Sequence, residues 1–244
     1  MVRLLLKLIS VSAKEKVINK VERVIIKKTE RVKLDNQENR HMKTVKADEA
    51  GLKAAAEIIR KGGVAIYPTE TVYGLGCAPH DAEATKKILQ IKERQEKPLP
   101  LICSNTEMVQ KIVQMNPTAE KLATKFWPGP LMLVLPKKMD YPVYVTFGKK
   151  TLGVRVSGLE VSRRLTELSG GVLVSTSANK SGQPPALTAK EAMDKLGGRV
   201  DVVVDGGPSQ GQKPSTVLDL SGSEMWIARS GPITGNMIME ALRG

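Results

Sequence analysis

Cysteine and histidine are nearly missing from this chain of 244 residues, which has two of each. Cys77 and Cys103 lie far apart in the sequence, so they cannot build a disulfide framework or a cysteine-based zinc site. His41 and His80 are too few for a multi-histidine metal site, and a Ser-His-Asp triad also needs a placed imidazole. This scarcity excludes most metal centres and triad hydrolases, and two free thiols favour a cytoplasmic protein.

Long apolar runs and aromatic residues are scarce as well. The N-terminal sequence MVRLLLKLISVS has an apolar run of only a few residues, whereas a membrane span needs about 20. No small-residue cleavage site of a secretory signal precedes the next charged block. Aromatic residues make up 3% of the chain, so a surface that stacks nucleic-acid bases is poorly supplied. We therefore expect neither a transmembrane helix nor secretion.

Acidic residues are outnumbered, since 38 Lys+Arg face 25 Asp+Glu and the formal net charge is +13. Residues 1–46 hold 13 basic and 5 acidic residues, a net charge of 13 − 5 = +8. We therefore assign residues 1–45 to a basic N-terminal extension that is partly helical or disordered, with Val17, Val21 and Val24 at helical spacing. A solvated or partly docked extension is the favoured interpretation, ahead of a nucleic-acid arm, and Met42 is a candidate initiator.

Residues 46–244 alternate short apolar runs with amphipathic windows, which predicts one α/β domain with a single twisted mixed β-sheet and flanking helices. The predicted strands are residues 64–68, 99–104, 130–136, 152–156, 171–177, 201–205, 215–220 and 225–229. A first helix is predicted from the cap Asp48 to the Gly62-Gly63 stop. Further helices are predicted near residues 81–93, 105–114, 117–126, 159–168, 188–196 and 233–242.

Polar residues gather where the predicted strands end, the place at which α/β proteins bind ligands. Hydroxyl groups and glycines follow the first strand in residues 68–76, and four hydroxyls with an amide follow another in residues 175–182. Lys92 and Arg94 flank the end of a helix. Each group alone is commonly a cap, a turn or a surface charge. Their convergence predicts an anion site suited to a polyphosphate or a carboxylate.

Two familiar nucleotide motifs are incomplete. Gly74-Leu75-Gly76 lacks the third glycine of a dinucleotide-binding turn. Residues 206–213 nearly match a P-loop, but Gln212 stands at the lysine position and Pro214 follows where a hydroxyl should contact magnesium. The sequence therefore disfavours a Walker-type nucleotidase.

Taken in order, the motifs resemble the YrdC family of L-threonylcarbamoyl-AMP synthases over about residues 46–232. The motifs are PTETVYGLG (68–76), Lys92-x-Arg94, FWPGPL (126–131), LGVRV (152–156), STSANKSG (175–182), PSTVLDL (214–220) and Arg229-Ser230-Gly231. The resemblance implies a YrdC/RibB-like fold with a basic concave face. It also implies condensation of L-threonine, bicarbonate and ATP to threonylcarbamoyl-AMP and pyrophosphate, for threonylcarbamoyladenosine modification of tRNA by a downstream transferase complex.

The resemblance also implies site residues. Threonine-binding residues would be Thr69, Cys103, Arg155, Ser175 and Ser215. ATP-binding residues would be Lys92, Arg94, Thr151, Ser177, Asn179 and Arg229, of which Lys92, Arg94, Ser177 and Asn179 are also the catalytic candidates. No protein metal ligand is expected, because Mg²⁺ would bind through the ATP phosphates. Three positions depart from the family: Cys103 where histidine is frequent, Met132 where threonine is usual, and Gln95 where proline is common.

This chemistry needs closely packed reactants and neutralised phosphates rather than a redox cofactor or a nucleophilic side chain. Lys92, Arg94 and Arg229 can stabilise triphosphate charge, and Ser177 and Asn179 can hold phosphate oxygens. Arg155 suits a bidentate grip on threonine's carboxylate. No general base is evident. Two alternatives stay open: a module that binds double-stranded RNA or tRNA without synthase activity, and a carbamoyl-transfer module of the hydrogenase-maturation type, for which a CxxC pair is lacking.

Overall fold

The computed structural model describes residues 42–94, 97–196, 198–211 and 213–243. Most of the predicted extension, including the helical pattern of Val17 to Val24, lies outside the described residues, as do Gln95 and Gln212. Residues 43–45, which we assigned to the extension, instead belong to strand β1 (Lys43–Lys46), which pairs in parallel with β9 (Val202–Asp205). The ordered sheet therefore begins a few residues before the expected boundary.

The strands form two mixed sheets. The first sheet has the order β1, β9, β2 (Ala65–Tyr67), β3 (Gly74–Gly76) and β8 (Thr176–Ser177). The second has the order β11 (Trp226–Arg229), β10 (Thr216–Asp219), β5 (Leu131–Pro136), β6 (Thr151–Val156), β4 (Leu101–Cys103) and β7 (Val172–Val174). Each sheet contains parallel and antiparallel pairs. The mixed α/β class is confirmed, whereas the strands divide between two sheets where we predicted one.

The division occurs inside the segment predicted as one strand over residues 171–177. Ser175 separates β7 from β8, and its backbone N–H donates to the carbonyl of Pro100 at 2.8 Å. One residue earlier, the N–H of Val174 donates to the carbonyl of Cys77 at 3.0 Å. The chain therefore changes sheets at Ser175, and the two sheets meet along this segment. Both contacts join residues far apart in the sequence, so a local pattern could not reveal them.

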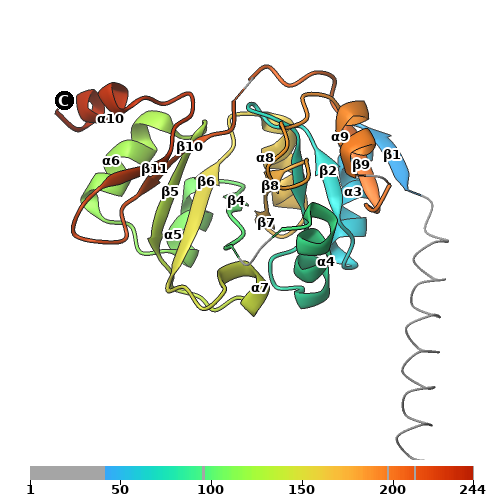
Figure 1. The fold of residues 1–244 in the computed structure, drawn as a ribbon, viewed down its shortest axis with the longest axis horizontal. Coiled ribbons are helices and arrows are strands. Elements are labelled where there is room, and N and C mark those ends of the chain that lie inside the picture. Colours follow the sequence, from blue (N-terminus) through green and yellow to red (C-terminus); the bar gives the residue numbers. More distant parts are fainter. Residues whose placement is uncertain (1–41, 95–96, 197, 212, 244) are drawn as a thin grey trace, which may run out of the picture. The chain divides into compact units, whose positions relative to one another are not determined.

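Helices flank both sheets (Figure 1). They are α3 (Glu49–Arg60), α4 (Ala82–Lys92), α5 (Thr106–Ile112), α6 (Pro117–Phe126), α7 (Val143–Thr146), α8 (Glu160–Leu168), α9 (Ala189–Leu196) and α10 (Gly235–Arg243). The seven predicted helices are confirmed, and the short α7 is an addition. Asp48 caps α3 as expected, because its carboxylate accepts the N–H of Gly51 at 2.8 Å. No helix among the described residues has both the length and the apolar content needed to cross a membrane.

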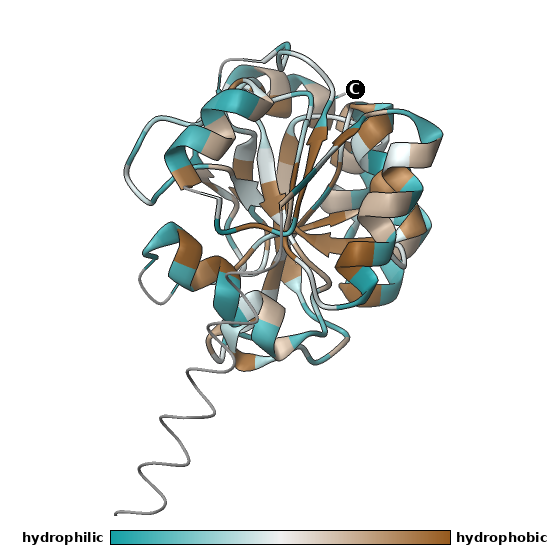
Figure 2. Ribbon diagram, turned by 90° about the vertical axis from the view of Figure 1, so that its right-hand side faces the viewer, coloured by the Kyte–Doolittle hydropathy of each residue, from teal (hydrophilic) through white to brown (hydrophobic). Residues whose placement is uncertain are grey.

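The side chains of β5 alternate between the core and an open face. Leu131, Leu133 and Leu135 are fully buried in a core cluster that includes residues of α6 and α10. Met132 and Val134 point to the opposite face and line a cavity. Hydrophobic residues accordingly concentrate in the strands at the centre of Figure 2. In the described part of the chain, α6 and α10 pack on the core side of β5, and the cavity on the opposite face is available to a ligand.

Candidate functional site

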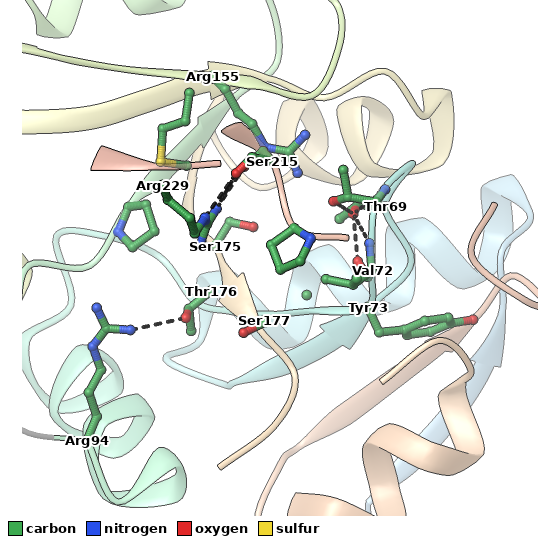
Figure 3. Close-up of a pocket in the computed structure, with 15 residues that line it drawn as sticks. Thr69, Val72, Tyr73, Arg94, Arg155, Ser175, Thr176, Ser177, Ser215 and Arg229 are labelled. Atoms are coloured by element: carbon green, nitrogen blue, oxygen red, sulfur yellow. Dashed lines mark hydrogen bonds between the residues drawn. The ribbon is translucent and has the colours of Figure 1, made fainter. Parts of the chain in front are cut away.

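A cavity lies where the two sheets meet (Figure 3). Its walls come from the turn after β2 through Thr69 and Thr71, from β6 through Arg155, from the sheet junction through Ser175, and from the start of β10 through Ser215. Its volume is about 130 Å³, close to the roughly 150 Å³ cavity that accommodates benzene. The cavity therefore suits a ligand of amino-acid size.

Two larger cavities flank it. One, of about 540 Å³, lies between the end of α4 and the loop after β8 and is lined by Lys92 and Asn179. The other, of about 560 Å³, lies on the open face of the second sheet and is lined by Met132 and Thr151. Arg94 lines all three cavities. The three spaces therefore adjoin one another around Arg94, and we refer to them together as the groove, whose combined space is large enough for a nucleotide beside a small ligand.

The hydroxyl of Thr69 is engaged within its own turn. It donates to the carbonyl of Val72 at 2.6 Å, lies 2.9 Å from the hydroxyl of Thr71, and accepts the N–H groups of Thr71 and Val72. Such a hydroxyl-stabilised turn fixes the backbone shape. The structure thus brings Thr69 to the cavity as expected, but its hydrogen already has a partner.

Arg155 lines the cavity and is paired with Glu70, a residue that sequence reasoning missed. Its Nη1 donates to Oε1 of Glu70, and the other carboxylate oxygen accepts the hydroxyl of Ser157. Burial opposes ionisation of Glu70, yet the charge of Arg155 and the hydrogen bond from Ser157 hold the pKa of this carboxyl below its usual value. Glu70 stands inside the quoted motif PTETVYGLG, so a search for the counter-ion of a buried arginine could have found it.

Arg229 and Ser215 form a second contact in the same cavity. The Nε and Nη2 atoms of Arg229 donate to the carbonyl of Ser215 at 3.0 and 2.7 Å, and Nη2 also lies 3.1 Å from its hydroxyl oxygen (Figure 3). Burial, and then the charges of Arg155 and Arg94, lower the pKa of Arg229. Three guanidinium groups thus repel one another around one space, an arrangement that a bound anion would relieve.

Arg94 contacts the protein with only part of its guanidinium. Nη1 lies 3.4 Å from the hydroxyl of Thr176, and Nη2 donates to the carbonyl of Pro98 at 3.1 Å. Its Nε is buried without a hydrogen-bond partner among the described residues. A buried donor of this kind is costly unless a ligand or water completes it.

Lys92 holds the loop after β8. Its Nζ donates to the carbonyls of Ser177 and Asn179 at 2.5 and 2.7 Å, while its own carbonyl accepts the N–H of Ser181 at 3.0 Å. Burial, followed by the charge of Arg94, lowers the pKa of Lys92 to about 7. The site contains this expected residue, and at least two of its donors serve the loop.

The amide of Asn179 is oriented by the same loop. Its Nδ2 donates to the carbonyls of Lys180 and Gln183 at 2.8 and 2.7 Å, which fixes which end of the amide is nitrogen. Its Oδ1 is buried with no partner in the described chain. Both donors are thus engaged, so the phosphate contact that we expected from Asn179 has no hydrogen available to it. The side chain instead offers an acceptor.

The remaining expected residues lie in the groove, with one exception. Ser175 and Ser177 line the central cavity, and Thr151 lines the cavity on the open sheet face. Cys103 lines none of these three cavities, because its side chain is directed into the core cluster, where it is fully buried together with Leu101 of the same strand. Burial raises the pKa of this thiol to about 12, so it is neutral at physiological pH.

Metal ligands are not clustered in the described part of the chain. No group of three or more His, Cys, Asp or Glu side chains there could hold a metal ion. Any cation in the groove would therefore rely mainly on oxygens of a ligand, as Mg²⁺ does on nucleotide phosphates.

Comparison with known proteins adds a consistent set of relatives. A family model for the Sua5/YciO/YrdC domain, described as "Telomere recombination", matches residues 57–231. The threonylcarbamoyl-AMP synthase of Pyrococcus abyssi is 38% identical over 176 residues, which are 71% of this chain and 52% of that protein. The protein of the same name from Thiobacillus denitrificans is 38% identical over 182 residues, 74% of this chain and 96% of that protein.

A solved structure of similar fold is that of P. abyssi Sua5 complexed with L-threonine. It has 35% sequence identity and a TM-score of 0.77, over 82% of this chain and 59% of that one. The chain thus spans about half the length of the P. abyssi relative and nearly all of the T. denitrificans relative.

Proposed function

The chain belongs to the Sua5/YciO/YrdC family, and from this premise we propose that it condenses L-threonine, bicarbonate and ATP to threonylcarbamoyl-AMP and pyrophosphate. The observation that carries the proposal is the meeting of Arg94, Arg155 and Arg229 at one small cavity within a nucleotide-sized groove. The names of two relatives and the threonine complex of P. abyssi Sua5 support it.

The central cavity is the proposed threonine site. Arg155 suits the carboxylate of the amino acid, because a planar guanidinium can donate two parallel hydrogen bonds to it. The hydroxyl of Ser215 accepts from Arg229, which leaves its hydrogen free to donate to the threonine hydroxyl. Ser175 adds a further hydroxyl to the wall. Thr69 acts here by shaping the turn, and Cys103, whose side chain is buried in the core, is not part of this proposed site.

ATP is proposed to lie along the two larger cavities, with its phosphates beside Arg94. Arg94 reaches all three cavities, so it can contact a triphosphate whose reacting phosphorus lies beside the threonine site. Arg229 lines the central cavity and the cavity on the open sheet face, where Thr151 also lies. These cations would stabilise the charge that develops as pyrophosphate leaves.

The reaction would take place in two steps. The threonine amine attacks the carbon of bicarbonate, and loss of water gives a carbamate. A carbamate oxygen then attacks the α-phosphorus of ATP, and the bond from this phosphorus to the β-phosphate bridging oxygen breaks. The site residues orient the three reactants and neutralise charge, a contribution that can lower the barrier by several kcal/mol.

Mg²⁺ fits the donor set near Asn179. The buried Oδ1 of Asn179 is an oxygen acceptor without a partner in the described chain, and Mg²⁺ prefers oxygen ligands while retaining phosphates and waters. When bound, the ion would neutralise phosphate charge. In the cell the product would pass to a transferase that modifies tRNA, so we expect a cytoplasmic enzyme with tRNA or this transferase as its partner.

Pyrophosphate release tests the proposal. We expect release that requires threonine and bicarbonate together, and little release with valine, because a site that hydrogen-bonds a hydroxyl discriminates against an analogue lacking it. Serine should support slower turnover, since a missing methyl group costs about 1–3 kcal/mol. Binding of tRNA without any threonine-dependent release would favour an RNA-binding module instead.

A further inference from the structure

A buried ion pair lies directly behind the wall of the threonine cavity. The side chains of Arg155 and Glu70 are 5% and 16% exposed, and Nη1 of Arg155 donates to Oε1 of Glu70. Arg155 lines the cavity, whereas Glu70 does not, although its neighbours Thr69 and Thr71 do. The turn after β2 therefore places the side chains of Thr69 and Thr71 at the cavity. The carboxylate of Glu70, the residue between them in the sequence, instead contacts Arg155 outside the cavity wall.

The surroundings of Glu70 restrict where its carboxylate can go. A Cβ atom on Gly158 would lie 3.1 Å from Cγ of Glu70, and one on Gly211 would lie 2.6 Å from its carbonyl oxygen. Two other segments of the chain thus pack closely on this residue. The hydroxyl of Ser157 holds the second carboxylate oxygen. The carboxylate is fixed by contacts on several sides, so it can in turn fix the guanidinium.

The pair also sets the charge of the cavity. Arg94, Arg155 and Arg229 all line it, and no carboxylate of the described residues does. Glu70 compensates one of the three positive charges from outside the wall. A site that is less positive before the substrate arrives attracts small anions less strongly, so it stays available to an amino acid.

We propose that Glu70 is the positioning residue for substrate recognition: it holds one edge of the Arg155 guanidinium, aims the remaining donors at the carboxylate of the amino-acid substrate, and prevents small anions from occupying Arg155. This inference deepens the proposed function and rests on it for the identity of the substrate. An arginine has five N–H donors in a rigid fork, so one edge can bind Glu70 while another binds the ligand.

Equilibrium binding of L-threonine tests the inference without requiring turnover. Titration calorimetry would compare the wild type with Glu70→Ala and Glu70→Gln, with exposed Glu160→Ala as the matched control. Loss of a charge-assisted hydrogen bond that orients a ligand group costs about tenfold in affinity or more. We expect Glu70→Ala to weaken threonine binding by about this factor and to leave ATP binding within about twofold. Glu160→Ala should bind both as the wild type does.

Acetate is the second probe, because it presents only a carboxylate. Glu70→Gln keeps the shape and one acceptor but removes the charge, so acetate should compete with threonine at several-fold lower concentration than in the wild type. Equal acetate competition in both proteins, or threonine and ATP binding weakened to the same extent in Glu70→Ala, would overturn the inference. A wild type that binds threonine but releases no pyrophosphate would contradict the proposed function while the binding comparison still decides the role of Glu70. A wild type that binds no threonine would contradict both.

Discussion

At the scale of single residues, the groove is organised around cations whose protein partners are incomplete. Arg94 touches three cavities and has a buried Nε without a partner in the described chain. Arg229 is held by Ser215, and Arg155 by Glu70. These contacts fix the side chains of Arg155 and Arg229 in the cavity wall. A ligand would instead supply Arg94 with the hydrogen-bond acceptor that its Nε lacks in the described chain.

Replacing Arg94 with alanine should therefore affect catalysis more than folding. We expect a loss of about 2–4 kcal/mol of transition-state stabilisation, as for removal of one preorganised donor. The melting temperature without ligand should stay within a few degrees, because the lost contacts with Thr176 and Pro98 are offset by relief of repulsion with Arg229. Pyrophosphate release and thermal unfolding with and without ATP would measure both effects.

Arg94→Lys should recover only part of the activity, since lysine is a point charge without the planar fork. Exposed Lys86→Ala on α4 is the matched control and should behave as the wild type. If ATP stabilised wild type and Arg94→Ala equally and activity were retained, Arg94 would be an ordinary surface cation.

The second residue-scale prediction concerns Lys92 and pH. Its pKa is lowered from 10.5 to about 7, first by burial and then by Arg94. Between these two pH values the unfolded chain holds a proton that the folded chain has lost, so the folded state gains stability as pH rises. We expect the unfolding free energy of the wild type, relative to Lys92→Met, to increase from pH 7 to pH 10. Urea unfolding at several pH values would measure it.

Lys86→Met is the control for this pH series, because Lys86 is exposed on the same helix. Its difference from the wild type should not change over the same range. A wild type that loses stability relative to Lys92→Met as pH rises would show that the Lys92 ammonium is favoured by its two carbonyl partners rather than penalised by burial.

Sequence reasoning at this scale predicted that cations following a helix or a strand converge on one anion site, and Arg94, Arg155 and Arg229 all line one cavity. It failed for Glu70, whose role depends on an ion pair across 85 positions of sequence. It also failed for Cys103, because the side to which a central strand directs a side chain depends on register.

At the scale of elements, the junction between the two sheets determines the shape of the site. β3 follows the site's first turn and lies beside β7, and Gly76 there leaves room for the carbonyl of Val174. A Cβ atom on Gly76 would lie 2.1 Å from that oxygen and 3.0 Å from the ring of Tyr67. Neither backbone nor a fully buried ring can move away easily, so glycine is required by close approach.

Gly76→Ala should consequently destabilise the fold by about 1–3 kcal/mol or more, as overpacking does. In a domain of this size each kcal/mol lowers the melting temperature by about 2–4 °C. Gly222→Ala is the control, because nothing lies within 4 Å of its Cβ position. Equal melting temperatures for the two variants would mean that the two sheets can move apart at Gly76 without loss of folding stability.

Local patterns predicted most elements and missed those created by partners. Capped helices such as α3 and apolar strands such as β5 were anticipated, since their signals lie within each segment. β1 has the polar sequence KTVK and β3 the sequence GLG, and both are strands because neighbouring strands pair with them. The division of residues 171–177 between two sheets likewise required the distant carbonyl of Pro100.

At the scale of the whole molecule, the first prediction concerns the basic extension. Residues 1–41 carry 11 basic and 5 acidic residues, a net charge of 11 − 5 = +6, and none of the recognised motifs. A chain that starts at Met42 keeps β1 and should fold and release pyrophosphate at the full rate. A chain that starts at Asp48 loses β1 and its pairing with β9, so it should melt at a lower temperature.

Binding of tRNA would separate two roles of the extension. If the extension assists encounter with tRNA, the shorter chain should bind tRNA more weakly and with a smaller dependence on salt, because fewer phosphates are neutralised. Loss of soluble protein or of most activity in the chain that starts at Met42 would instead show that residues 1–41 are needed by the fold or the site.

The most direct test of the account is to follow isotopically labelled bicarbonate into an adenylate by mass spectrometry. Wild-type protein with ATP, Mg²⁺ and L-threonine should form labelled threonylcarbamoyl-AMP in equal amount to the pyrophosphate released. Arg94→Ala should form it more slowly by about the factor that 2–4 kcal/mol implies, and replacing threonine with valine should yield little labelled product. Pyrophosphate released without label in an adenylate, or label incorporated equally by wild type and Arg94→Ala, would contradict the account.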